Sequence, residues 1–234
     1  MIAIAIVGPK KSGKTTLGVG LARELAGRGL TVAAAKSTSH HFDKADTDTD
    51  QYRAVCVGTL GIGPQESFVS WPGRRFLADL VPLVAADVLL VEGGKDLGIM
   101  PRVLLPAAAA RPKAFAPELA VACFGDKGLP GAPAVDSVPA LADLVLARGF
   151  ILPGLDCGAC GFADCRALAV EIVAGRAGVK DCKSRNAAVS VRVNGVALAL
   201  NPFVERMLGA GIRGLVSELK GYAPGRIEIE LEGR

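Results

Sequence analysis

The first fifteen residues constrain the fold of this chain more than any other stretch. Residues 2–7 form an apolar run that is too short for a helix and leads directly into the sequence GPKKSGKT at residues 8–15. Leu17, Leu21 and Leu25 then recur at helical spacing. A strand, a glycine-rich loop and a helix in this order are typical of an α/β fold with a mostly parallel sheet.

The loop has the spacing G-x4-G-K-[ST], which suits phosphate binding. Small residues let successive backbone N–H groups surround phosphate oxygens, and the helix that follows directs its positive end at the same point. Lys14 would reach the β- and γ-phosphates of a nucleoside triphosphate, and the Thr15 hydroxyl would hold Mg²⁺. An ordinary glycine turn is the alternative, which the flanking strand and helix disfavour. The predicted nucleotide-binding residues are Gly8, Pro9, Lys10, Lys11, Ser12, Gly13, Lys14, Thr15 and Thr16.

A second magnesium ligand is expected where another buried strand ends. The apolar run at 88–91 is followed by Glu92 and two glycines. Glu92 is, with Lys14, a candidate catalytic residue, because it could bind Mg²⁺ directly, bind it through water or orient the attacking water. It could instead only cap the following turn.

Residues 37–53 are expected to form a long polar loop, and such loops are usually functional or mobile. One aspartate of this loop could complete the magnesium shell, with a solvated acidic turn as the alternative. The candidates are Asp43, Asp46, Asp48 and Asp50. The adjacent His40 and His41 are not expected to bind a metal.

The alternation of strands and helices continues along the chain. Further strands are expected at 31–35, 103–105 and 119–124, and helices at 74–85 and 138–148. This order predicts a P-loop NTPase-like, mostly parallel sheet with helices on both faces.

A cysteine-rich segment follows residues 149–156, whose Pro-Gly pair is typical of a linker. Its four cysteines have the spacing C-x2-C-x4-C-x16-C, and Gly158 and Gly161 would let the backbone fold tightly around a cluster. Three thiolates close together, with a fourth after a helix at 165–174, favour a 4Fe-4S cluster over zinc, and disulfides are the least favoured alternative. The predicted cluster ligands are Cys157, Cys160, Cys165 and Cys182.

The tail is predicted to be a small ββαβ unit that acts as scaffold or docking surface. Alternating residues on either side of Asn194-Gly195 predict a hairpin, because both turn positions accept positive φ. An Asn-Pro pair at 201–202 begins a helix that ends before Gly221, and residues 226–231 alternate as a last strand. The predicted domains are residues 1–150, 151–185 and 186–234.

Composition narrows the classes of partner. Half of the 234 residues are hydrophobic, aromatic residues make up 5%, and the formal net charge is +4 with Lys and Arg scattered along the chain. A nucleic-acid partner is therefore not expected. No apolar run reaches the roughly 18 to 20 residues that a membrane span needs, and the first strand lacks the features of a signal peptide. A soluble, cytoplasmic protein is expected.

Several motifs occur together in the first 150 residues: GPKKSGKTT at 8–16, Lys36, DQYR at 50–53, VEGGK at 91–95 and Pro101-Arg102. In combination they resemble the molybdopterin-guanine dinucleotide biosynthesis adapter family, the B protein of that pathway. The resemblance implies a P-loop protein with weak GTPase activity, often dimeric, that assists the enzyme attaching GMP to molybdopterin. It also implies that Lys14, Thr15, Asp50 and Glu92 contact nucleotide and Mg²⁺. The nucleotide would be GTP, with ATP as the alternative because the chain has no N-K-x-D motif.

The cysteine segment is similar to the 4Fe-4S domain of the B subunit of Rnf-type electron transport complexes and of corrinoid iron-sulfur proteins. The two resemblances imply a GTP-binding maturation factor for a molybdenum or tungsten pterin cofactor. Its partner would be a guanylyltransferase or another cofactor-maturation protein, and a homodimer is a further expectation. The alternatives are an NTPase that drives electron transfer to another metallocofactor, and a nucleotide-gated scaffold with a purely structural cluster. A weak GTPase that needs a partner is expected, because no arginine finger has a supported position.

Overall fold

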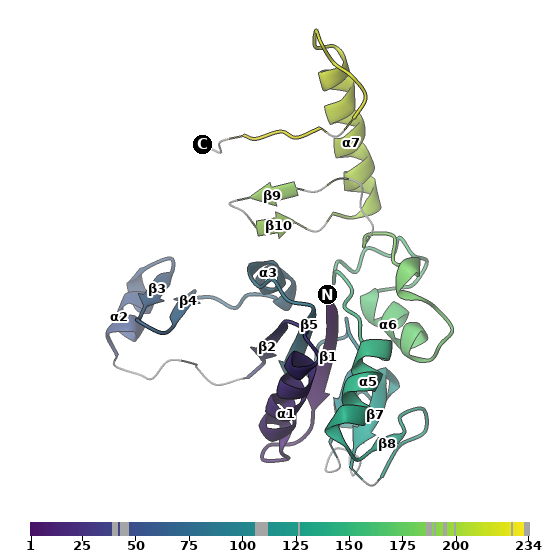
Figure 1. Ribbon diagram of the computed structural model, residues 1–234. Helices are drawn as coiled ribbons and strands as arrows, with labels where there is room; N and C mark the ends of the chain where they lie inside the picture. Colours follow the sequence, from purple (N-terminus) through teal and green to yellow (C-terminus); the bar gives the residue numbers. More distant parts are fainter. Residues whose placement is uncertain are drawn as a thin grey trace.

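A six-stranded parallel sheet forms the centre of the molecule (Figure 1). The computed structural model describes residues 1–38, 42, 47–105, 112–125, 127–185, 189, 191–193, 196–198, 200–225 and 227–231. The strands of the sheet are β1 (Ile2–Val7), β2 (Val32–Lys36), β5 (Val88–Glu92), β6 (Arg102–Leu104), β7 (Ala120–Phe124) and β8 (Ala134–Val135). They lie in the order β2-β5-β1-β6-β7-β8, with parallel pairing throughout the sheet. The predicted mostly parallel sheet is confirmed.

Both faces of the sheet are covered, and alternation along β1 divides the core between them. Ile4 and Ile6 pack on the face covered by α1 (Lys14–Gly27) and α5 (Val138–Arg148). Ala3 and Ala5 belong to the core of the other face, which includes residues of the short α3 (Leu77–Leu80) and of the 3-10 turn η1 (Val81–Leu83). Since side chains alternate across a strand, burial on both faces requires the continuous apolar run of β1.

The cysteine segment shares the core of the sheet. Leu168 of α6 (Cys165–Val173) is fully buried in the same cluster as residues of β1 and α5. The predicted linker is packed, because Phe150 and Leu152 are buried, Phe150 N donates to Ala3 O (3.1 Å) and Leu152 N donates to Ile99 O (2.8 Å). Packing is therefore continuous across the predicted 150/151 boundary, and the three-domain division stays a prediction.

The region predicted as a long loop contains a helix. α2 (Asp48–Val55) begins where Thr47 accepts a hydrogen bond from Asp50 N (3.2 Å), and two aspartates in its first turn favour the positive end of the helix. The loop prediction is therefore wrong from residue 48 onward, because Thr47 caps a helix there. His40, His41, Asp43 and Asp46 lie outside the described residues.

A hairpin that the sequence analysis did not predict follows α2. Its strands β3 (Thr59–Ile62) and β4 (Ser67–Ser70) are antiparallel and stand to one side of the main sheet in Figure 1. The helix predicted at 74–85 is reduced to α3 and η1, because Pro82 lacks the N–H that a continuing α-helix needs. Two further 3-10 turns, η2 (Pro112–Phe115) and η3 (Pro117–Leu119), lead into β7.

The tail forms two strands and a helix. β9 (Val191–Val193) and β10 (Val196–Leu198) pair antiparallel as predicted, although their Asn194-Gly195 turn lies outside the described residues. α7 (Pro202–Ser217) begins at Asn201, whose side chain accepts from Val204 N (3.0 Å). The predicted last strand does not form over residues 227–231, and no strand of the described parts of the chain pairs with them. Within the described parts of the chain, no helix is long and apolar enough to cross a membrane.

Candidate functional site

The glycine loop lies where the sequence analysis placed it, between the end of β1 and the start of α1. Gly8 is required by close packing, since a Cβ there would lie 2.8 Å from Ser12 Oγ and 3.2 Å from Leu105 Cβ. Gly13 is the N-cap of α1 with φ +86°, a conformation that glycine adopts without strain. Ser12 Oγ is buried and has no hydrogen-bond partner among the described residues, so the loop holds a polar atom that a ligand can satisfy.

Lys14 folds back onto its own loop. Its Nζ donates to Gly8 O (3.0 Å) and to Pro9 O. The first turn of α1 carries no acidic residue, so no carboxylate on that turn opposes an anion at the positive end of the helix. Phosphate oxygens can therefore replace the two carbonyl oxygens as partners of the ammonium group, which suits the role predicted for Lys14.

Glu92 meets Thr15 at the carboxyl edge of the sheet. Thr15 Oγ1 donates to Glu92 Oε2 (2.8 Å), although 77 residues separate the two in sequence. The register explains the meeting, because Ile6 of β1 pairs with Glu92 of β5, and the loop that carries Thr15 follows directly after β1. Two oxygen ligands of the kind that Mg²⁺ prefers thus lie side by side at the phosphate loop.

Two residues around Glu92 were not assigned a role at this site. Lys36, at the end of β2, forms an ion pair with Glu92 Oε1 (3.3 Å). Gly93 follows with φ +86°, and a Cβ there would lie 2.6 Å from Ser37 O. In the sequence, Lys36 stands out only as part of the family motif. Its contact with Glu92 follows from the pairing of β2 with β5, which the sequence does not reveal. Glycine at 93 lets the segments after these two strands approach each other closely.

Asp50 lies elsewhere in the structure. It belongs to the first turn of α2, where its carboxylate forms an ion pair with Arg53. In Figure 1, α2 stands beside the β3–β4 hairpin and away from α1. The structure therefore brings Thr15 and Glu92 together without Asp50, whose role as a magnesium ligand stays a prediction.

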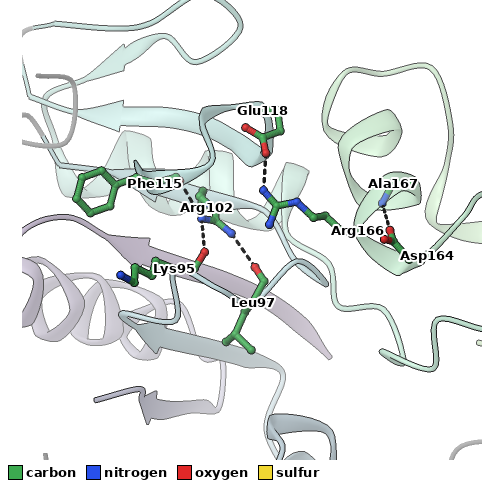
Figure 2. A network of polar contacts seen from close by, with 8 residues as sticks. All are labelled: Lys95, Leu97, Arg102, Phe115, Glu118, Asp164, Arg166 and Ala167. Atoms are coloured by element: carbon green, nitrogen blue, oxygen red, sulfur yellow. Dashed lines mark hydrogen bonds and ion pairs between the residues drawn. The ribbon is translucent and has the colours of Figure 1, made fainter. Parts of the chain in front are cut away.

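Arg102, which belongs to the family motif, is a fully buried cation. Its guanidinium donates to three backbone carbonyls, at Lys95 (3.1 Å), Leu97 (2.7 Å) and Phe115 (2.8 Å), as Figure 2 shows. Burial, and secondarily the charge of Arg166, lower the pKa of Arg102 to about 10. Arg102 thereby holds the segment that follows Glu92 against the chain before β7. An arginine at the start of an apolar strand is the feature of the sequence that could have indicated a buried cation here.

The four predicted cluster ligands line one pocket, together with Leu155, Leu168 and Lys183 among others. Cys165 and Cys182 are buried, Cys160 is half-buried and Cys157 is exposed. All four are free thiols. No group of three or more His, Cys, Asp or Glu side chains in the described residues is close enough to hold a single metal ion. Four cysteine sulfurs around one hollow are a donor set that suits an iron-sulfur cluster, with zinc as the alternative, and their role as ligands stays a prediction.

Local geometry explains how the backbone surrounds this pocket. Gly158 and Gly161 have φ values of +65° and +87°, and Gly161 N donates to Gly158 O (2.9 Å), which closes a tight turn between the first two cysteines. Asp156 accepts from Cys165 N (2.8 Å), and Asp164 caps α6 by accepting from Ala167 N. Burial raises the pKa of the Cys165 thiol, so a bound metal would be needed to hold it as thiolate.

Comparison with known proteins finds matches over the two regions that contain these residues. A family model described as molybdopterin guanine dinucleotide synthesis protein B matches residues 3–122, and one described as "Putative Fe-S cluster" matches residues 152–184. A protein of Methanocaldococcus jannaschii described as "Putative molybdopterin-guanine dinucleotide biosynthesis adapter protein" is 24% identical over 251 residues, covering 99% of this chain and 98% of that protein.

Solved structures show the same fold. Two structures of MobB from Bacillus subtilis align with TM-scores of 0.50 and 0.51, at 24% and 23% identity. Each alignment covers 64% of this chain and 99% of the other chain. The first family model spans just over half of the 234 residues. The chain therefore belongs to the molybdopterin guanine dinucleotide synthesis protein B family.

Proposed function

We propose that this chain is a GTP-binding adapter in the biosynthesis of a molybdenum or tungsten pterin guanine dinucleotide cofactor, and that it carries a 4Fe-4S cluster. The observation that carries the proposal is the hydrogen bond between Thr15 and Glu92 beside an intact phosphate loop. It supports a magnesium nucleotide site within a family whose description concerns molybdopterin guanine dinucleotide.

In this proposal the P-loop residues 8–16 surround the phosphates, and Lys14 provides the mobile positive contact. Thr15 and Glu92 hold Mg²⁺, with Asp50 as the further candidate ligand. Bound Mg²⁺ would neutralise phosphate charge. Hydrolysis by the isolated chain is slow, and a partner protein provides the missing groups.

Calorimetry tests the nucleotide site. Wild-type protein should bind Mg·GTP, and Lys14→Ala should remove tight binding because the loop loses its mobile cation. Arg23→Ala is a suitable control, since Arg23 is an exposed residue of the same helix. Guanine preference rests on the family resemblance, so the titration is repeated with Mg·ATP. Equal affinity of wild type and Lys14→Ala for Mg·GTP would reject the site.

Anaerobic purification tests the cluster. Iron and acid-labile sulfide should co-purify with the chain, and the absorbance should be that of a brown iron-sulfur protein. A colourless protein that contains zinc and no sulfide would contradict the assignment. The exposed Cys157 leaves one edge of the pocket open to solvent, which favours nucleotide-driven electron transfer as a second candidate function. That function predicts a change in cluster potential during nucleotide turnover.

The proposed partner is a guanylyltransferase of cofactor maturation in the cytoplasm. A homodimer is also proposed, because the β3–β4 hairpin presents apolar side chains to solvent, with Leu60 73% and Ile62 88% exposed. Analytical ultracentrifugation of wild type and of a variant with both residues changed to Ser tests this. A wild-type protein that stays monomeric at high micromolar concentration would count against the dimer.

A further inference from the structure

The segment that follows Glu92 extends from the nucleotide site to the cysteine segment. It begins at Gly93 and Gly94, which have φ values of +86° and +66°, and it ends at Arg102 in β6. Gly93 N donates to Ile6 O (3.0 Å), so the start of the segment is fixed to β1 beside the phosphate loop. The same segment therefore contacts the strand that positions the nucleotide loop.

The middle of this segment packs directly on Arg166. A Cβ at Gly98 would lie 2.7 Å from Arg166 Cβ and 2.9 Å from Arg166 Cγ, so the glycine backbone lies against the arginine stem. Arg166 is the residue after Cys165, a predicted cluster ligand at the start of α6. Arg166 thus contacts the segment that follows Glu92 and is bonded in the chain to a predicted cluster ligand.

Further contacts hold this arrangement together, and Figure 2 draws those of Arg166 and Arg102. Arg166 forms an ion pair with Glu118 (2.5 Å), and Arg102 holds the carbonyls of Lys95 and Leu97. In addition, Leu152 N donates to Ile99 O (2.8 Å), which joins the start of the cysteine segment to the residue next to Gly98. The segment has therefore little freedom to move independently of α6.

We propose that Arg166 is a positioning residue through which the cluster controls the nucleotide site. The inference rests on the proposed function, and it names a regulation of that site. A bound cluster ties Cys165 to the three other cysteines and so holds the first turn of α6 in place. Loss of the cluster releases that turn, Arg166 no longer supports Gly98, and the segment that follows Glu92 loses this contact. Affinity for the magnesium nucleotide then falls.

Thermodynamic linkage makes the effect reciprocal. Coupling between two sites typically changes affinity about 5- to 150-fold, and we expect the lower part of this range because a single contact region carries it. Cluster loss should therefore weaken Mg·GTP binding at least about fivefold, and bound Mg·GTP should slow release of iron to a chelator by a similar factor.

The experiment compares three proteins, wild type, Arg166→Ala and Arg176→Ala, each with its cluster and after removal of the cluster by a chelator under anaerobic conditions. Arg176 is a matched control, because it forms an exposed ion pair with Glu171 near the other end of α6. Calorimetry with Mg·GTP should show weaker binding after cluster removal in wild type and Arg176→Ala. Arg166→Ala should show the same affinity in both forms, close to that of cluster-free wild type.

The outcomes separate the two claims. If cluster-loaded wild type does not bind Mg·GTP, the proposed function fails. If it binds Mg·GTP equally well with and without the cluster, or if Arg166→Ala retains the difference, the coupling is wrong while the proposed function stands. If cluster-free protein does not stay folded, the rate of iron release from the loaded proteins decides. Mg·GTP should slow it in wild type and Arg176→Ala only, and equal slowing in Arg166→Ala overturns the coupling.

Discussion

Arg102→Met should destabilise the protein strongly, although the residue is outside both proposed sites. Methionine keeps much of the side-chain volume but leaves the carbonyls of Lys95, Leu97 and Phe115 without their buried donor. Hydrogen bonds from a charged donor are worth about 1.5–3 kcal/mol each, so the three together supply about 5–9 kcal/mol. The variant therefore removes a large favourable contribution.

Burial of the charge opposes this contribution. Burial lowers the pKa of Arg102 to about 10, a shift that corresponds to roughly 3–4 kcal/mol at about 1.4 kcal/mol per pKa unit. Subtracting this cost from the hydrogen-bond contribution leaves a net loss of about 1–6 kcal/mol on substitution. That range includes the value of about 3–5 kcal/mol typical when one partner of a buried charged contact is removed. For a chain of this size the melting temperature should fall by about 10 °C.

Urea denaturation at pH 7 measures the loss, with all proteins loaded with cluster and free of nucleotide so that ligand binding does not alter the comparison. Arg176→Met, which removes an exposed ion pair, should change stability by less than about 1 kcal/mol. Hydrogen exchange should also rise in residues 93–99 of Arg102→Met. A loss below about 1 kcal/mol would refute the reasoning, because it would mean that the three carbonyls find other donors at little cost.

Further predictions concern the two sites and the pH dependence of stability. Glu92→Gln should weaken nucleotide binding by about tenfold in the presence of Mg²⁺, and little when Mg²⁺ is chelated; equal loss in both conditions would argue against a magnesium role. Cys160→Ser should lose most iron and sulfide in chemical analysis, whereas Cys56→Ser, outside the pocket, should retain them. Hydrogen bonds from Thr31 lower the pKa of Asp87, so its contribution is present above the ordinary Asp pKa near 4 and is lost as pH falls through the lower native value. The stability gap between wild type and Asp87→Asn in urea should therefore close at low pH, and a gap that persists there would contradict this.

Local patterns predicted the elements that depend on nearby residues. The phosphate loop, α5 and the pair β9–β10 follow from periodicity, caps and turn residues within a few positions of one another. Local patterns do not predict two other segments correctly, one that begins with a helix cap and one that would need a neighbouring strand. The polar composition predicts a loop where Thr47 caps α2, and residues 227–231 alternate like a strand but pair with no strand among the described residues.

The contacts that define the sites differ in how far apart their residues are in sequence. The cysteine spacing and the G-x4-G-K-T motif could be recognised from the sequence by itself, because the residues of each motif follow one another at fixed intervals along a limited stretch of chain. Only the tertiary structure decided that Thr15 meets Glu92, that Lys36 joins them, and that Gly98 lies on Arg166. Strand order brings such residues together, and hydrophobic periodicity along one strand carries no information about which strand will be its neighbour.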